Sequence, residues 1–476
     1  MAAGFAPLLS TARHEGDALH MKLVELFRLN SRVNGSMREP PRGVRSAIEL
    51  SHRIMSQHGE VSGNRLTHET LKLYQAFDQA ERAAFFDLLA REFSPNPDEI
   101  GRAADAYRKE ASAENLARLE RVVEPPRREL FRRLNMAPGA TSVLVEMRGQ
   151  LLQETAGSSQ WAPVAADLTH LLTSWFNRGF LVLQRIDWRT PANILEKLIR
   201  FEAVHQIQGW NDLRRRLAAD RRCYGFFHPA LPDDPIIFIE VALTRGMSDG
   251  VQPLLDPDSP VLNPQSADCA MFYSITNCHQ GLRGVPLGSF LIKQVVEDLG
   301  REFPRLRTFA TISPAPKFRA WLANQNQSGK WDGHAEAIAE LAKMVDEPQW
   351  FENRELPARL QRDLTGCFAY YLLHAKQGER PYDPVARFHL RNGARLERIN
   401  WLGDKSMVGI DLSAGFMVNY VYRLAEVARN HELYMREHRV AASRLVTAAL
   451  SGWMRKTGAI PARPPQAITN ARANAG

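Results

Sequence analysis

The stretch AMFYSITNCHQGLRGVPLGSFLIKQVVEDLGREF, residues 270–303, decides the fold of the larger part of this chain. Its first nine residues are mostly aromatic, β-branched or otherwise apolar, which predicts a strand over 270–278. Apolar residues at helical spacing predict a helix over 287–303. Gly281, Gly284 and Gly288 lie between or at the start of these elements. A glycine loop that joins a strand to a helix exposes backbone N–H groups at the positive end of the helix, and such loops bind phosphate groups.

The flanking segments extend a sheet in both directions. Strands are predicted at 221–229, 235–244, 306–313, 396–401 and 416–422, and helices at 315–325, across 334–378 and near 434–455. Four prolines and two aspartates mark Pro253–Ser266 as a loop. We therefore predict that residues 179–476 form a mixed β-sheet with helices on both faces. The Pro- and Ala-rich tail after about residue 458 is expected to be disordered.

Residues 1–178 have a different character. Segments such as 44–55, 66–93 and 142–156 place apolar side chains at helical spacing, and β-branched alternation is almost missing. We predict a helical bundle whose apolar faces serve packing and homo-oligomerisation, as a dimer or a tetramer. The predicted fold class is α+β, with an all-helical region before the sheet.

Length, charge and cysteine content set further limits. A chain of 476 residues is too long for one ordinary core, so two domains are expected. The net charge of +8 favours anionic partners without choosing among them. The four cysteines form no CxxC pair, which disfavours a metal site and favours a reducing compartment. Without an apolar run of 18 residues or a basic secretory leader, we expect a cytoplasmic protein that does not contact a membrane.

The glycine loop permits two interpretations. Its GxxG spacing differs from the dinucleotide fingerprint GxGxxG, and no P-loop GK[ST] follows, so a Rossmann site is disfavoured. The alternatives are a tight strand-to-helix turn without a ligand and a cradle for a bulky phosphate.

The pattern QGLRGVPLGSFLI (280–292) is similar to the pyrophosphate loop of the GNAT superfamily of acetyltransferases. That resemblance implies a coenzyme A site between two splayed strands, here 270–278 and 306–313. Further segments, including FIEVALT, FYSI, ISPAPKF, FHLRNGARLERINW and MVNYVY, resemble the malonyl-CoA decarboxylase family in the order that the family has them. The resemblance covers roughly residues 165–425 and implies decarboxylation of malonyl-CoA to acetyl-CoA and CO2.

The resemblance also implies site residues where the motifs match. Ser313 in ISPAP and His389 in FHLRNGA correspond to the active-site serine and histidine of the family. Ser274 and Tyr422 are expected to line the pocket. Pro286 stands where the family has a glutamate. The implied coenzyme A loop consists of Arg283, Gly284, Val285, Pro286, Leu287, Gly288 and Ser289.

The chemistry of decarboxylation suits these residue types. Loss of CO2 leaves an enolate, which is stabilised by hydrogen-bond donors at the thioester oxygen and then needs a proton. We expect His389 to donate that proton and Ser313 to orient the histidine or to bind the carboxylate, although a water held by Ser313 or Tyr422 is an alternative donor. No metal or organic cofactor is required, because the thioester accepts the electron pair. From sequence alone, a structural role for His389 and a helix N-cap role for Ser313 remain open.

Other candidate groups have less support. The arginines Arg214–Arg216, Arg221 and Arg222 could meet the 3′-phosphate of coenzyme A, although a solvated helix face or a subunit contact is favoured. They lack interleaved aromatic residues, so nucleic-acid binding is not predicted. Cys278 and His279 are adjacent on a predicted strand and point to opposite faces, which disfavours a thiol nucleophile. Two rival functions remain, namely an acyl-CoA-dependent acyltransferase and a non-catalytic acyl-CoA sensor.

Overall fold

A computed structural model gives the fold and describes residues 40–56, 60–154, 159–285, 287, 291–328, 335–352 and 358–457. The described residues divide into two compact units. Unit 1 contains the residues up to Val143 together with Leu151–Leu168, and unit 2 contains Leu144–Gln150 and the residues from Thr169 onward. The boundary at 178/179 and the oligomerisation role of the first region stay predictions, and the tail after about residue 458 lies outside the described residues.

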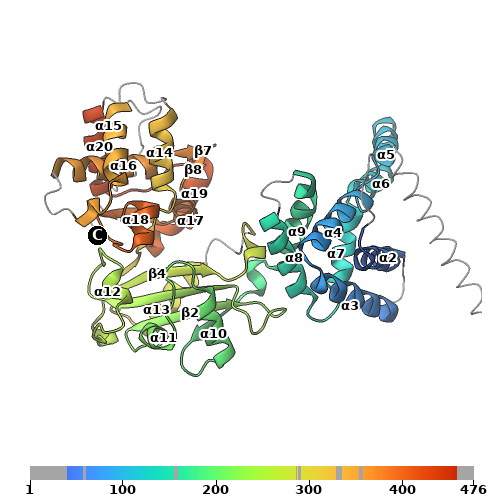
Figure 1. The fold of residues 1–476 in the computed structure, drawn as a ribbon, viewed down its shortest axis with the longest axis horizontal. Coiled ribbons are helices and arrows are strands. Elements are labelled where there is room, and N and C mark those ends of the chain that lie inside the picture. The colour runs from blue at the N-terminus through green and yellow to red at the C-terminus, as the bar shows by residue number, and fades with distance from the viewer. Residues whose placement is uncertain are drawn as a thin grey trace, which may run out of the picture. The chain divides into compact units, whose positions relative to one another are not determined.

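The region before residue 176 is helical, as predicted (Figure 1). Its helices are α2 (Arg42–Ser56), α3 (Glu60–Ala76), α4 (Gln79–Glu92), α5 (Pro97–Lys109), α6 (Ala113–Val123), α7 (Pro126–Leu134), α8 (Ala140–Glu154) and α9 (Ala162–Trp175).

The single long helix predicted over 66–93 is wrong, because α3 ends at Ala76 and α4 begins at Gln79. Asp78 is the N-cap of α4, and its carboxylate accepts a hydrogen bond from the Glu81 amide at 2.8 Å. The Glu81 side chain accepts one from the Asp78 amide at 3.1 Å, which completes a capping box. Because good helix formers surround this capping box, the start of α4 at Asp78 was not recognised in the sequence.

The main sheet of unit 2 has the strand order β1-β2-β3-β4-β5-β10-β6, with β9 paired to β10. The described strands of this sheet are β1 (Val182–Ile186), β2 (Arg221–Phe227), β3 (Ile237–Thr244), β4 (Cys269–Asn277), β5 (Thr308–Thr311), β6 (Ser313–Pro314), β9 (Arg395–Asn400) and β10 (Met417–Val421), and a separate hairpin contains β7 (Lys376–Gln377) and β8 (Arg380–Pro381).

The central strands β4 and β5 form the parallel pair of this sheet, and they diverge. Their register runs from Cys269 opposite Thr308 to Phe272 opposite Thr311. Beyond this point β4 continues to Asn277, whereas the segment that follows β5 continues as β6 and pairs with β10. An opening therefore forms between the two strand ends. The predicted α+β fold class, with a mixed sheet after a helical region, is confirmed.

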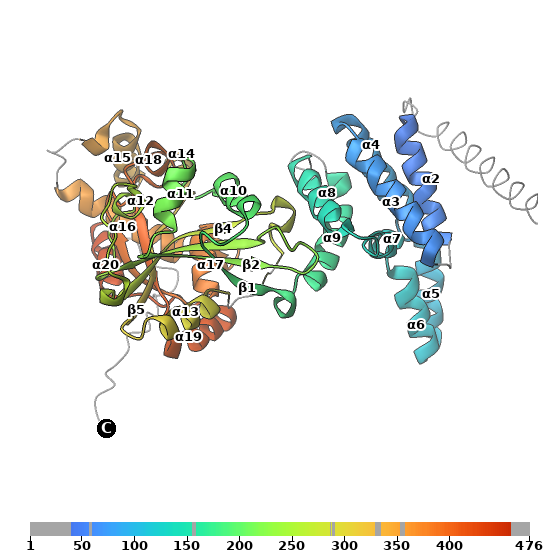
Figure 2. The same cartoon turned by 90° about the horizontal axis from the view of Figure 1, so that it is seen from below.

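Helices cover both faces of the sheet. Cys223 and Phe227 of β2 pack with α10 and α11, whereas Tyr224 and Phe226 belong to the cluster that includes α13 (Figure 2). The helices of unit 2 are α10 (Ala192–Phe201), α11 (Trp210–Arg216), α12 (Gln252–Leu255), α13 (Leu291–Glu302), α14 (Phe318–Ser328), α15 (Ala335–Asp346), α16 (Ala358–His374), α17 (Pro384–Arg391), α18 (Met407–Ser413), α19 (Leu424–Glu437) and α20 (Arg444–Thr457).

Three boundaries differ from the sequence prediction. Strand β1 was not predicted, and four of its five residues are not buried, so its hydrophobic pattern is weak. The helix predicted near 434–455 is two helices, because His438 adopts a left-handed conformation with φ of 53° and ends α19. The predicted loop over Pro253–Ser266 begins with most of the short helix α12.

Candidate active site

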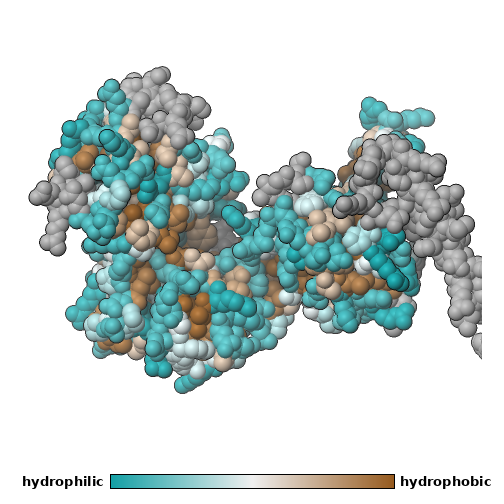
Figure 3. Space-filling view, in the orientation of Figure 1, coloured by the Kyte–Doolittle hydropathy of each residue, from teal (hydrophilic) through white to brown (hydrophobic). Residues whose placement is uncertain are grey.

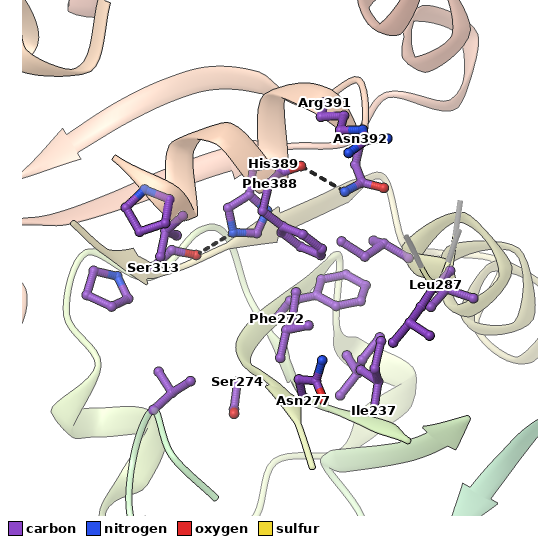
Figure 4. A pocket seen from close by; sticks show the side chains of 18 of the residues that line it. Ile237, Phe272, Ser274, Asn277, Leu287, Ser313, Phe388, His389, Arg391 and Asn392 are labelled. Atoms are coloured by element: carbon purple, nitrogen blue, oxygen red, sulfur yellow. Dashed lines mark hydrogen bonds between the residues drawn. The ribbon is translucent and has the colours of Figure 1, made fainter. Parts of the chain in front are cut away.

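A cavity of about 440 Å³ opens in unit 2 beside the diverging ends of β4 and β5. Ile237, Phe272, Phe388 and Leu287 present apolar side chains to it (Figure 4). In the surface view, hydrophobic residues gather between β4 and the helices α17 and α18 of unit 2 (Figure 3). The cavity is lined by Val204, Ile237, Ile239, Phe272, Tyr273, Ser274, Ile275, Asn277, Gly284, Val285, Leu287, Leu291, Ile292, Ile312, Ser313, Pro314, Pro384, Val385, Phe388, His389, Arg391 and Asn392.

Two elements far apart in sequence bring Ser313 and His389 together. Ser313 lies in β6, where it pairs with Val418 of β10. His389 lies in the last turn of α17, which Asp383 caps by accepting hydrogen bonds from two amides at its N-terminus. The Ser313 Oγ and the His389 Nε2 are 3.0 Å apart (Figure 4). Because Ser313 belongs to a strand and α14 begins only at Phe318, the N-cap interpretation of Ser313 is wrong.

Hydrogen bonds extend from this pair on both sides. The Ser313 hydroxyl donates to the Thr311 Oγ1 at 3.0 Å. The His389 Nδ1 lies 2.8 Å from the Tyr422 hydroxyl, and the imidazole stacks on Tyr420 with ring centroids 4.5 Å apart. One assignment of protons gives each of these hydrogen bonds a donor and an acceptor: Tyr422 donates to Nδ1, Nε2–H donates to Ser313, and Ser313 donates to Thr311. The imidazole is then neutral, with its N–H toward the cavity.

Burial controls the charge of this group. His389 is 2% exposed, and burial lowers its pKa to about 3. Burial likewise raises the pKa of Tyr422 well above 10, so the phenol stays protonated. Among the described residues, no carboxylate counteracts the effect of burial on His389. A negative charge close to this imidazole would favour its protonated, positively charged form.

The other two predicted pocket residues have different positions. Ser274 lines the cavity, and its hydroxyl donates to the Glu202 Oε2 at 2.7 Å. Thr276 donates to the same oxygen at 3.2 Å. Tyr422 is not among the lining residues and instead holds the far side of His389. Glu202 was missed by the sequence analysis, because a single acidic residue after an amphipathic helix carries no local signal of its tertiary contacts.

The predicted coenzyme A loop is partly described. Gly284, Val285 and Leu287 line the cavity, whereas Arg283 is exposed and is not among the lining residues. The positive φ of 81° at Gly284 requires glycine. The amides of Arg283 and Val285 close turns within the loop, with acceptors at 3.0 Å. Among the predicted loop residues, Pro286, Gly288 and Ser289 lie outside the part of the chain that the structure describes.

Of the five arginines Arg214–Arg216, Arg221 and Arg222, four are buried. The predicted role as a solvated helix face or a subunit contact is therefore wrong for these four. Arg215 pairs with Asp220 through two bonds of 2.7 and 3.0 Å, and Arg221 pairs with the same carboxylate. Arg222 pairs with Glu302. Arg216 pairs with Asp212 and with Glu240 at 2.8 and 2.9 Å. These guanidinium groups link α11 and α13 to the sheet, and of the five arginines only Arg214 is exposed.

The diverging parallel strands, the glycine-containing loop and the buried Ser313–His389 pair meet at one cavity, as expected for the class of enzymes, acting on coenzyme A thioesters, that the sequence motifs resemble. Comparison with known proteins specifies the family. The model of the malonyl-CoA decarboxylase C-terminal domain matches residues 179–459, and that of the N-terminal domain matches residues 93–176. The chain belongs to the malonyl-CoA decarboxylase family, and its enzyme class is that of the carboxy-lyases.

Individual relatives agree. The mitochondrial malonyl-CoA decarboxylase of Anser anser anser is 34% identical over 81% of this chain and 83% of the relative. The crystal structure of malonyl-CoA decarboxylase from Rhodopseudomonas palustris is 48% identical, with a TM-score of 0.83, and covers 86% of this chain and 100% of that chain. The corresponding Agrobacterium vitis structure is 44% identical, with a TM-score of 0.80, over 85% and 99%.

No helix within the described residues is long and apolar enough to cross a lipid bilayer.

Proposed function

We propose that this chain decarboxylates malonyl-CoA by means of His389 and Ser313, with the acyl group in the cavity and the coenzyme A diphosphate at the Gly284 loop. The C–C bond to the carboxylate breaks, its electron pair enters the thioester to form an enolate, and CO2 leaves. His389 then gives a proton to the enolate carbon and regains one from solvent. The single observation that carries this proposal is a buried Ser–His pair, 3.0 Å apart, in a cavity that the loop also lines.

The substrate supplies a negative charge near His389 that no described residue supplies. The pKa of His389, about 3, reflects burial alone. A negative charge within about 4–6 Å raises the pKa of a histidine by roughly 1–3 units. The malonyl carboxylate has this charge before the reaction, and the enolate has it afterwards. The imidazole therefore gains affinity for a proton only when substrate is bound.

Ser313 and Tyr422 orient the histidine in this proposal. Tyr422 fixes the tautomer through Nδ1, so that the Nε2–H points to Ser313 and the cavity. When the thioester oxygen gains charge, Nε2–H and the Ser313 hydroxyl are the neighbouring donors that can meet it. To do so, Nε2–H turns from the Ser313 oxygen and the Ser313 hydroxyl turns from Thr311, so these donors exchange hydrogen bonds within the protein for bonds to the substrate.

Two further statements belong to the proposal. The chain forms a homo-oligomer, a dimer or a tetramer, through its helical region, which size-exclusion chromatography with light scattering tests. The cytoplasm is the proposed compartment, supported by free cysteines at 223, 269, 278 and 367, and fractionation of the source cells tests it.

Two measurements test the activity and its mechanism. Incubation of the protein with malonyl-CoA and no acceptor is expected to release CO2 and acetyl-CoA; an acyltransferase or a binding protein would release neither. Calorimetry at pH 5.5, in two buffers of different ionisation enthalpy, then measures proton uptake on binding of sulfoacetyl-CoA, which keeps the anionic group but cannot lose CO2. With the pKa of His389 raised from about 3 by roughly 1–3 units, we expect uptake of a fraction of a proton, up to about three quarters, less uptake with acetyl-CoA and none by His389→Asn. Equal uptake by wild type and His389→Asn would refute the proton role of His389.

A further inference from the structure

Within unit 2, the segment Leu144–Gln150 of helix α8 lies directly against the loop that we propose binds the diphosphate. A Cβ atom at Gly281 would lie 1.7 Å from the Val145 carbonyl oxygen, so only glycine permits this approach. On the helix side, a Cβ at Gly149 would lie 3.2 Å from the Gly281 nitrogen. Two backbones in contact through glycines form a rigid seam, and a shift of α8 would displace the loop.

Arg148 of α8 reaches from this seam into the loop. It is 4% exposed, and its Nε donates to the Thr169 hydroxyl at 3.0 Å. Its Nη1 donates to the Gly281 carbonyl oxygen, and its Nη2 donates to the Arg283 carbonyl oxygen at 3.0 Å. All three acceptors are uncharged. Burial lowers the pKa of Arg148, and no described carboxylate offsets that effect.

The other buried arginines of unit 2 provide the contrast. Arg215, Arg216 and Arg222 each form an ion pair with a carboxylate. A buried guanidinium without a counter-charge is costly, and a bound anion removes that cost. Arg148 lies behind the loop at which the proposed function places a diphosphate.

The geometry of the peptide bond connects Arg148 to the cavity. The Arg283 carbonyl and the Gly284 amide belong to one planar trans peptide, in which C=O and N–H point in opposite directions. By holding the Arg283 oxygen, Arg148 turns the Gly284 N–H away from α8 and polarises it. Gly284 lines the cavity, whereas the Arg283 and Val285 amides bond within the loop.

We propose that Arg148 is a positioning residue for coenzyme A: it orients the Gly284 amide toward the diphosphate and places an uncompensated positive charge behind the loop. This inference rests on the proposed function of the loop. Arg148 lies in the range that matches the N-terminal domain of the family, so that range also contributes to substrate binding, beyond the packing role predicted for it.

A pair of substrates tests the proposal. Malonyl-pantetheine has the same reacting group as malonyl-CoA but lacks the diphosphate and the nucleotide. We expect Arg148→Met to lower kcat/KM for malonyl-CoA roughly tenfold to a hundredfold, mainly through KM, with much less effect on malonyl-pantetheine. Arg222→Met, which removes a buried guanidinium that pairs with Glu302, is the matched control and should leave the ratio of the two kcat/KM values unchanged. Arg148→Lys keeps the charge without the fork and should give an intermediate ratio.

An equal loss with both substrates would mean that Arg148 only supports the fold, and would overturn the proposal. If Arg148→Met does not fold, Arg148→Lys decides through the same ratio. Binding of desulfo-CoA, measured by calorimetry, separates this inference from the mechanism. Weaker binding by Arg148→Lys upholds the role of Arg148 even if His389→Asn retains turnover, and unchanged binding refutes that role even if His389 proves catalytic.

Discussion

Two buried polar clusters of unit 2 differ in how they handle charge. Arg216 and Glu240 are 2% and 1% exposed and lie 2.9 Å apart. Burial raises the pKa of Glu240 to about 8, and Arg216 also forms an ion pair with Asp212 at 2.8 Å. Ser313 and His389 are also buried, at 7% and 2% exposure, yet they form neutral hydrogen bonds. In the Arg216 cluster, carboxyl groups of the same chain lie beside the guanidinium, so no anionic ligand is needed to balance its charge. The neutral cluster has no counter-charge among the described residues, so an anionic substrate can change the protonation of His389.

The largest effect should come from breaking the ionic cluster. Burial opposes the charge of Arg216, but Glu240 and Asp212 raise its pKa, so it is fully charged. Arg216→Met leaves Glu240 buried without its partner and is expected to lower the free energy of unfolding by about 3–5 kcal/mol. Denaturant titration measures this loss. Arg216→Met/Glu240→Met should recover much of it, and kcat of the folded double variant should match wild type. A large loss of kcat in that variant would show that the cluster serves the reaction.

Disrupting the neutral Ser313–His389 cluster should reduce turnover and leave the free energy of unfolding nearly unchanged. His389→Asn removes the proposed proton donor and is expected to reduce kcat by a factor on the order of 100 or more, with little loss of stability. His374→Asn is the matched control, since His374 is a second histidine of unit 2 whose pKa burial lowers, to about 4, and it does not line the cavity. Near-normal turnover of the His389 variant would remove the histidine from the mechanism.

A smaller effect should follow from loss of the hydrogen bond by which Tyr422 fixes the tautomer of His389. Tyr422→Phe removes the hydroxyl 2.8 Å from the His389 Nδ1 and keeps the ring. We expect kcat to fall about tenfold, because one hydrogen bond to a buried group contributes roughly 1 kcal/mol and its loss frees the ring to reorient. Steady-state kinetics with malonyl-CoA measure the change. An effect confined to KM would instead indicate that Tyr422 binds the substrate.

The smallest effect concerns pH and stability. In the folded state the pKa of His389 is about 3, whereas an unfolded histidine has one near 6.5. Between these values the unfolded state binds more protons, so this residue makes stability fall as pH falls below about 6.5, by at most about 1.4 kcal/mol per pH unit. Denaturant midpoints at pH 7 and pH 5.5 should therefore diverge less in His389→Asn than in wild type. An identical pH dependence of the two proteins would contradict a neutral His389.

Much of the fold follows from local pattern. The strand-loop-helix core at 270–303 was predicted because β-branched and aromatic residues, glycines and helical spacing succeed one another there. Errors arose where a single residue outweighs the pattern, as at Asp78, which divides a run of helix formers, and at His438, which ends α19. Ser313 and His389 entered the analysis through motif resemblance, because neither residue has a local feature that distinguishes a catalytic group from a structural one.

By itself, the sequence determined the order of helices and strands, the glycine loop and the family, since these depend on residue types at short spacing. Only the tertiary structure decided which polar groups meet. Residues 313, 389 and 422 are joined by packing of β6, α17 and the end of β10, and burial then sets the low pKa of the imidazole. The same holds for the arginines, because the sequence does not reveal the partner of a guanidinium group. Arg216 meets a carboxylate, whereas Arg148 meets a carbonyl oxygen of the loop that contains Gly284. Distances between residues far apart in the chain decide such roles, and no local pattern encodes them.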